Sequence, residues 1–143
     1  MNARQTSVLI IEPHPMMRQA LQTIVTMEPS LQLLEPSAMD PNAFPFVTPN
    51  QDDVLFLPSK PDLILFSLGN PGLGELKILA ELRRTMPDAY ILALTTDELP
   101  GQNKTALQHG AHAVITKSVS QEKLQAALRS IHEHSSITAS QTK

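Results

Sequence analysis

The residue best placed to do chemistry in this chain is Ser67, which follows a short apolar run from Asp62 to Phe66. That run is typical of a β-strand buried on both faces of a sheet. The glycines and proline of the next stretch, LGNPGLGE, predict a turn, and helical spacing of apolar residues begins after Glu75. In open α/β sheets, ligands bind where a strand opens into such a loop. We therefore expect Ser67 to point into a functional crevice.

A serine could act as a hydrolase nucleophile with His14 or Lys117 as its base. Such a pair is defined by geometry and not by the presence of both residues in one chain, and no nucleophile-elbow sequence surrounds Ser67. We expect Ser67 to be a hydrogen-bonded structural residue. The chain is accordingly predicted not to be an enzyme.

The histidines do not predict a metal site. His109 and His112 flank Gly110 on a predicted turn, while His132 and His134 are two residues apart on a predicted helix and therefore diverge. The absence of cysteine excludes disulfides and thiolate metal sites, and it favours a cytoplasmic location. We expect neither a metal nor a cofactor.

The composition of the chain restricts the kinds of molecule that we expect it to bind. The chain has 143 residues, enough for one domain with its own core. Its formal net charge of −3 gives no support for a basic nucleic-acid surface. The longest apolar runs are too short to cross a bilayer, and we expect no secretion, because the first residues lack a charged-then-apolar leader pattern. We therefore expect protein partners, with no direct nucleic-acid binding by this chain alone and no membrane association.

Strand and helix patterns alternate along the chain. The predicted strands are residues 6–11, 31–34, 62–66, 90–95 and 113–116. The predicted helices are residues 16–27, 75–85 and 103–109, followed by a final helix capped by Ser120. This alternation predicts a parallel sheet with helices on both faces. We place one domain at residues 1–134 and a polar, disordered tail at 135–143.

The segment 37–61 departs from this alternation because it is rich in proline, with phenylalanines at positions 44, 46 and 56. Dense proline prevents a long helix, while the aromatic residues argue against free disorder. We expect an irregular segment packed on the sheet in place of a regular second helix, with one short strand or turn around residues 54–57. A solvent-exposed linker is the alternative.

Four motifs carry a family resemblance: VLIIEPHPMMRQAL, PDLILFSLGNPG, YILALTTD and GAHAVITKSVSQEKLQAAL. In this order they resemble the receiver domain of two-component response regulators, and most closely the receivers attached to helix-turn-helix transcription factors. The resemblance covers roughly residues 7–132. It implies a flavodoxin-like, doubly wound sheet of five parallel strands in the order 2-1-3-4-5, with a site at the carboxyl ends of the strands.

The resemblance also implies roles for single residues. In the family, two adjacent acids after the first strand and an aspartate after the third bind Mg²⁺, and that aspartate accepts a phosphoryl group from a histidine kinase. Here Glu12 occupies the first acid position, Pro13 replaces the second, and Ser67 replaces the phospho-accepting aspartate. Thr95 and Lys117 match the family residues that sense the phosphate.

These replacements change the charge of the implied site. The family site carries three carboxylates against one ammonium group, an excess that suits Mg²⁺. Here Glu12 is set against Lys117 alone, so the net charge is near zero. We predict no dedicated Mg²⁺ site, an ion pair between Lys117 and Glu12, and a hydrogen-bonded cluster completed by Ser67 and Thr95.

The family's switch residue is also replaced. Val114 stands where the family has an aromatic side chain that turns with the phosphorylation state, and valine has one dominant rotamer. The face made by the fourth helix, the fifth strand and the fifth helix is therefore expected to keep one conformation. Four residues are expected to decorate that face, with a solvated surface as an equal alternative: Lys104, Gln108, His112 and Lys123.

Taken together, these inferences predict a phosphorylation-independent pseudo-receiver. It would act as a protein-interaction module in transcriptional or two-component-type regulation, through the face just described, and would form a homodimer. The alternative is a ligand-sensing receiver domain of a transcription regulator that binds a small molecule in the altered crevice. DNA binding would need a separate partner or a longer parent protein.

Overall fold

The computed structural model describes residues 5–12, 14–35, 44–47, 54–57, 60–68, 73–95, 100–116 and 120–141. For residues 44–47, 54–57, 73–75, 100–103 and 134–141 this description covers the backbone only.

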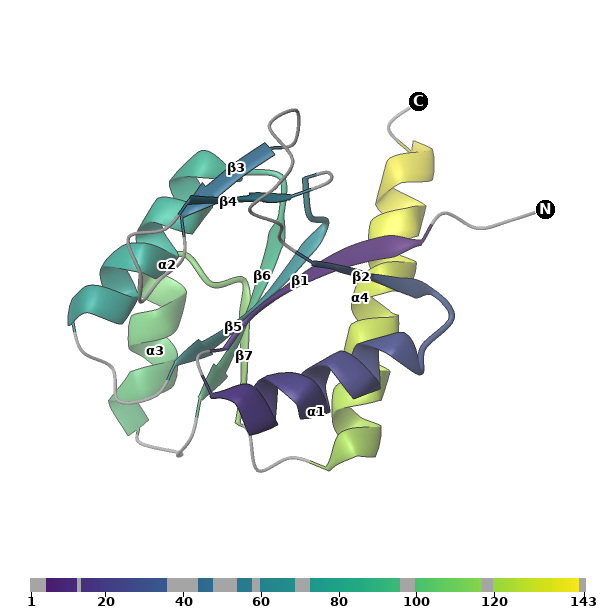
Figure 1. Ribbon diagram of the computed structural model, residues 1–143, viewed down its shortest axis with the longest axis horizontal. Coiled ribbons are helices and arrows are strands. Elements are labelled where there is room, and N and C mark those ends of the chain that lie inside the picture. Colours follow the sequence, from purple (N-terminus) through teal and green to yellow (C-terminus); the bar gives the residue numbers. More distant parts are fainter. Residues whose placement is uncertain are drawn as a thin grey trace.

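Five parallel strands form the central sheet. They are β1 (Thr6–Ile11), β2 (Leu31–Leu34), β5 (Leu63–Leu68), β6 (Tyr90–Thr95) and β7 (Ala113–Thr116). Their order is β2-β1-β5-β6-β7, so the predicted order 2-1-3-4-5 is confirmed (Figure 1). The central strand extends two residues beyond the predicted end at Phe66, because Ser67 and Leu68 still pair with β6.

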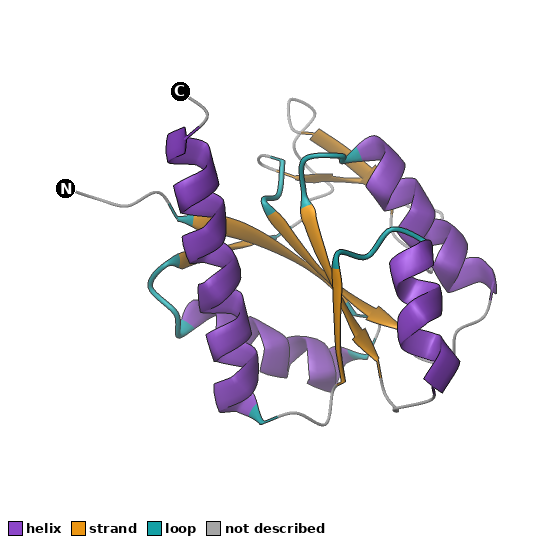
Figure 2. Cartoon of the chain, turned by 180° about the vertical axis from the view of Figure 1, so that it is seen from behind, coloured by secondary structure: helices purple, strands orange, loops and turns teal. Residues whose placement is uncertain are grey.

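Two helices cover each face of the sheet, as Figure 2 shows from behind. The helices α1 (Pro15–Thr26) and α4 (Gln121–Gln141) lie on one side, and α2 (Leu73–Thr85) and α3 (Pro100–Gln108) lie on the other. Pro15 stands at the first helical position of α1, where its fixed φ and missing N–H cost nothing. The doubly wound arrangement is the one predicted.

Strand alternation divides the core into two layers. In β5, Leu63 and Leu65 pack with α1 and α4, whereas Ile64 and Phe66 pack with α2 and α3. The side chains of all four residues are at most 1% exposed. Because successive side chains of a strand point to opposite faces, a strand buried on both sides must be apolar throughout.

Gly110 lies in the turn that follows α3, as predicted, and has a positive φ of +124°. A Cβ atom at this position would lie 2.7 Å from the Cβ of Arg83 on α2, closer than real Cβ contacts come. The glycine therefore serves two purposes. It turns the chain towards β7, and it lets α2 pack tightly against that turn.

The proline-rich segment contains more regular structure than predicted. The strand at Val54–Leu57 (β4) is confirmed, but it pairs antiparallel with a second strand, β3 (Phe44–Val47), which the sequence analysis missed. Pro45 lies within β3, opposite Phe56. A two-stranded ribbon has only edge strands, and a proline is tolerated at an edge because its missing N–H can face outward. This ribbon is separate from the five-stranded sheet.

The last helix is also longer than predicted. Residues from 135 onward were expected to form a disordered tail, but α4 continues to Gln141. The physical reason is that residues 121–141 contain neither glycine nor proline, so nothing interrupts the backbone hydrogen bonds of the helix. Among the described residues, no helix has the length and apolar character needed to span a membrane.

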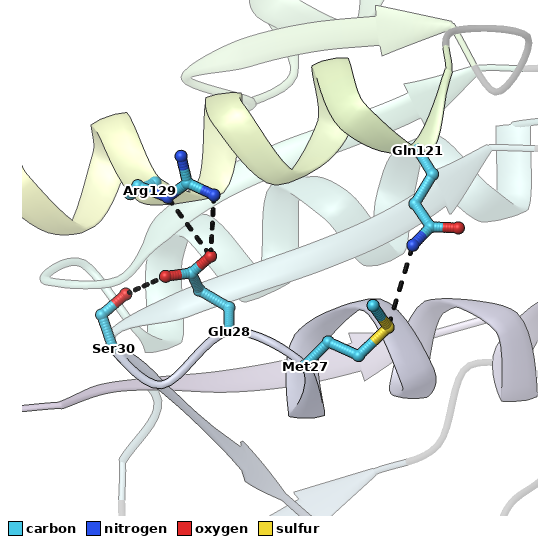
Figure 3. A network of polar contacts seen from close by, with 5 residues as sticks. All are labelled: Met27, Glu28, Ser30, Gln121 and Arg129. Atoms are coloured by element: carbon cyan, nitrogen blue, oxygen red, sulfur yellow. Dashed lines mark hydrogen bonds and ion pairs between the residues drawn. The ribbon is translucent and has the colours of Figure 1, made fainter.

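A polar network joins α4 to the corner between α1 and β2 (Figure 3). Arg129 donates from Nε and Nη2 to Oε1 of Glu28 at 3.2 and 3.1 Å, and the Ser30 hydroxyl donates to the other oxygen of Glu28. Close by, the Gln121 amide contacts the sulfur of Met27. Glu28 has a side chain only 12% exposed, so these donors replace most of the water that would otherwise contact its carboxylate.

Replacing Arg129 with methionine tests this joint. Arg129→Met keeps the aliphatic contacts of the side chain but leaves the largely buried Glu28 carboxylate with fewer donors. We expect the free energy of unfolding to fall by about 1 kcal/mol, at the low end for charged hydrogen bonds because the guanidinium is half exposed. Urea denaturation measures the change. The matched control is Arg84→Met, which removes an ion pair to Glu81 that is exposed on both sides and should leave stability nearly unchanged. Equal losses in the two variants would contradict the role given to Glu28.

Candidate functional site

Three of the predicted site residues meet at the carboxyl edge of the sheet. Glu12 directly follows β1, Ser67 is the next-to-last residue of β5, and Thr95 is the last residue of β6. These strands are parallel neighbours in the sheet, so their ends converge. All three residues are buried, with exposed fractions of 3%, 3% and 0%. Pro13 and Lys117 lie outside the described residues, so the Glu12–Lys117 ion pair stays a prediction.

Glu12 is held by the loop that follows it. Its Oε2 accepts a hydrogen bond from the backbone N–H of His14 at 3.1 Å, and its carbonyl oxygen accepts from Nη1 of Arg18 at 3.1 Å. His14 is the N-cap residue of α1, yet its side chain makes no cap hydrogen bond, and the first turn holds no acidic residue. The Glu12 carboxylate therefore supplies the negative charge that the helix dipole favours at this end.

Ser67 and Thr95 do not form the predicted hydrogen-bonded cluster. Among the described residues, neither hydroxyl has a hydrogen-bond partner, although both are buried. The sheet register explains this outcome, because Ser67 is opposite Leu94 while Thr95 is opposite Leu68. Paired residues share a face and successive residues alternate, so the two hydroxyls point to opposite faces of the sheet.

The unpartnered hydroxyl bears on the hydrolase hypothesis. A serine becomes a nucleophile only when an adjacent base accepts its proton. No described imidazole or amine is hydrogen-bonded to Ser67. His14, one of the two bases considered, is exposed and offers only its backbone N–H to the site. The described geometry therefore gives Ser67 no means of activation.

The effect of the buried Ser67 hydroxyl on the free energy of unfolding can be measured. We expect Ser67→Ala to leave the free energy of unfolding unchanged or to raise it by up to about 1 kcal/mol, because it removes a buried polar atom without a partner. The matched control is Ser7→Ala. The Ser7 hydroxyl donates to Asp62 and accepts from the Asp62 N–H, both at 3.0 Å, and its removal should cost about 1–2 kcal/mol. Denaturant titrations compare the two variants, and a Ser67→Ala loss as large as that of Ser7→Ala would show that Ser67 is hydrogen-bonded after all.

The predicted switch and face residues lie away from this crevice. Val114 sits in β7 opposite Ala93 and packs, half-buried, against the layer formed by α2 and α3. The four predicted face residues, all exposed, come from α3, from the start of β7 and from the first turn of α4: Lys104, Gln108, His112 and Lys123. Leu107, which the sequence analysis did not single out, is 48% exposed beside them on α3.

Three of the described histidines each contact a different partner. His109 Nδ1 contacts the carbonyl oxygen of Thr105, and the buried His132 contacts the hydroxyl of Thr6 on β1. His112 accepts a backbone hydrogen bond from Ile91. Within the described part of the chain, no group of three or more histidine or acidic side chains is arranged to hold a metal ion.

Comparison with known proteins decides the family. The model of the response regulator receiver domain matches residues 8–129. The chain belongs to this family. The predicted resemblance is thereby confirmed, and the chain is a receiver domain of the kind used in two-component signalling.

Curated relatives show the same domain within longer proteins. The nitrate/nitrite response regulator protein NarL of Escherichia coli K12 is 27% identical to this receiver domain over 132 residues, which cover 92% of this chain and 56% of NarL. The positive alginate biosynthesis regulatory protein of Pseudomonas aeruginosa is 32% identical over 126 residues, covering 86% of this chain and 46% of that protein. This receiver domain thus spans about half the length of these relatives.

Solved structures agree on the fold. A DNA-binding response regulator of the LuxR family from Staphylococcus aureus superposes with a TM-score of 0.62 at 21% identity, covering 90% of this chain and 99% of that chain. A CheY-like receiver domain protein from Methanospirillum hungatei gives 0.63 at 16% identity, with coverage of 91% and 95%. At these identities the likeness concerns the fold alone, and it confirms the flavodoxin-like arrangement.

Proposed function

We propose that this receiver domain works without aspartyl phosphorylation, as a protein-interaction module in two-component-type or transcriptional regulation. The observation that supports the proposal is the chemistry of position 67. The resemblance places the phospho-accepting aspartate there, and this chain has a buried serine hydroxyl without a described partner. An aspartyl phosphate is an acyl phosphate formed by a carboxylate nucleophile. A serine could form only a phosphate monoester, whose uncatalysed hydrolysis is extremely slow, so the reversible switch of the family is lost.

The surroundings of Glu12 support the same proposal. Mg²⁺ in such sites needs carboxylate oxygens that are free to coordinate it. Pro13 cannot supply one, and Glu12 already accepts a hydrogen bond from the His14 N–H at the start of α1. Glu12 is thus the one carboxylate that remains of the three in the family site. The proposed site therefore holds no dedicated Mg²⁺.

Incubation with acetyl phosphate and Mg²⁺ tests the loss of phosphorylation. We expect the intact mass of the chain and its amide NMR spectrum to stay unchanged, because no carboxylate is available at position 67 to receive the phosphoryl group. A stoichiometric mass gain of one phosphoryl group would contradict the proposal.

The matched variant restores both missing carboxylates, Pro13→Asp with Ser67→Asp. It should bind Mg²⁺ more tightly than the natural chain and gain a phosphoryl group under the same conditions, provided that circular dichroism shows it to be folded. If the variant is folded, binds Mg²⁺ and still gains no phosphate, the lost carboxylates are not the whole reason for the loss of phosphorylation.

The proposed interaction surface is formed by α3, β7 and α4. The sheet ends at β7, and the side chains of residues 113–116 are only half buried. Leu107 adds an exposed apolar side chain on α3, and Lys104 provides a positive charge on the same helix. Glu122, exposed in the first turn of α4, carries the opposite charge. In a two-fold dimer, Glu122 of one copy could face Lys104 of the other, which supports a homodimer.

Sedimentation velocity tests this surface. We expect the chain to dimerise, and Leu107→Glu to raise the dimer dissociation constant by about tenfold or more, because it places a charge in an apolar contact. Met16→Glu is the control, since Met16 is 86% exposed on α1 and lies outside the proposed surface. Equal weakening by both substitutions, or a chain that is monomeric at every concentration, would argue against the homodimer.

Small-molecule sensing in the crevice is the second candidate. It is favoured by the buried hydroxyl of Thr95, because a ligand on that face of the sheet could satisfy an atom that the described residues leave unpaired. Saturable thermal stabilisation by one metabolite, abolished in Thr95→Val, would favour this candidate over the first. DNA binding is proposed only for a longer parent protein, since the response regulator from S. aureus with a similar fold is a DNA-binding protein.

A further inference from the structure

His112 completes the sheet where the backbone of β7 does not. The backbone pairing of β6 with β7 begins at Leu92 opposite Ala113. One residue earlier, the Ile91 N–H donates to Nδ1 of His112 at 3.0 Å, and the Ile91 carbonyl oxygen accepts from the His112 N–H at 2.8 Å. A side-chain nitrogen thus stands in for a strand carbonyl. One of the two hydrogen bonds at this first rung between β6 and the edge strand depends on it.

This contact sets the protonation state of the imidazole. Nδ1 can accept the Ile91 N–H only as an unprotonated nitrogen, so the ring is neutral and carries its proton on Nε2. The ring also stacks on Tyr90, with centroids 4.9 Å apart and planes inclined by 20°. Protonation at Nδ1 would place two N–H donors against each other. The hydrogen bond to Ile91 would be lost.

The charged neighbours of His112 also disfavour its protonated form. Arg83 on α2 packs beside the turn at Gly110 and acts on the ring as a like charge. Although part of the His112 side chain is exposed, partial desolvation of the ring, the larger cause, and Arg83 together lower the pKa of His112 from its ordinary value of 6.5.

Other described titratable groups near these elements have partners of their own. His109 at the end of α3 contacts the Thr105 carbonyl oxygen, Glu81 on α2 pairs with Arg84, and Asp62 before β5 accepts from Ser7. Asp88, between α2 and β6, is exposed. None of these contacts supplies the imidazole with a compensating negative charge.

We propose that His112 is a pH-sensitive latch, which holds the first rung between β6 and β7 while the ring is neutral and releases it when the ring is protonated. The latch lies on the face proposed above for protein interaction. Acidification would therefore loosen that face through chemistry unrelated to phosphorylation. The geometry of the latch is independent of the proposed dimer.

The sign of the effect follows from the lowered pKa. The unfolded chain takes up the proton near pH 6.5, whereas the folded chain resists it until a lower pH. The stabilisation from the neutral ring is therefore fully present above pH 6.5. It is lost as the pH falls from 6.5 through the lower pKa of the folded state.

Native-state hydrogen exchange on the whole chain tests the latch. Between about pH 7.5 and about pH 4.5, the protection factor of the Ile91 amide should fall about five- to tenfold, the effect of losing one hydrogen bond. The fall should be absent in His112→Gln, whose side chain does not titrate, and should persist in His109→Gln. Amides of β1 and β5 report global stability, and their protection should fall less than that of Ile91.

Two outcomes would overturn the proposal: Ile91 protection that does not change with pH, or an equal fall in His112→Gln. Because the measurement needs no partner, it separates failure of the latch from failure of the dimer. If the latch is confirmed and the chain is monomeric, only the proposed homodimer is lost.

Discussion

The parallel register of β1, β5 and β6 is the constraint on which the rest of this structure depends. It brings Glu12, Ser67 and Thr95 to one edge of the sheet, where receiver domains keep their chemistry. The same register sends the hydroxyls of Ser67 and Thr95 to opposite faces. Although Ser67 and Thr95 lie on neighbouring strands, their hydroxyls therefore do not form a hydrogen bond with each other. Among the described residues, the edge keeps the positions of a receiver site, but the hydroxyls of Ser67 and Thr95 have no hydrogen-bond partner there.

Stability in the described chain comes from elsewhere. Two apolar layers, one with α1 and α4 and one with α2 and α3, enclose a sheet whose central strand is buried throughout. Polar anchors lie at the margins of these layers, such as Ser7 with Asp62 at the start of the strands and Glu28 with Arg129 between helices. Because these anchors are remote from the crevice, the fold can survive changes at residue 67. This separation supports the proposal above, because a receiver fold held by such anchors does not need phosphorylation chemistry for its stability.

Sequence patterns predicted the parts of the fold that depend on a local requirement for one type of residue. Continuous apolar runs marked the strands, and Gly110 marked the end of α3, because each reflects a local physical requirement. The patterns failed where the conformation of a segment depends on the strand that pairs with it. Phe44–Val47 forms a strand because Val54–Leu57 pairs with it. The high proline content of this segment led to the prediction of irregular structure, so the ribbon was missed. Likewise, the polar composition after residue 134 suggested disorder, whereas the backbone simply continues as a helix to Gln141.

By itself, the sequence determined the receiver family, the strand order and the absence of an aspartate at position 67, because these depend on residue identity and on order along the chain. Only the tertiary structure decided which polar groups are satisfied. Glu12 finds the His14 N–H, Ser67 and Thr95 find no described partner, and His112 replaces a strand carbonyl. Hydrogen bonds depend on distance and direction within a few tenths of an ångström, and no residue spacing along a chain specifies them at that scale.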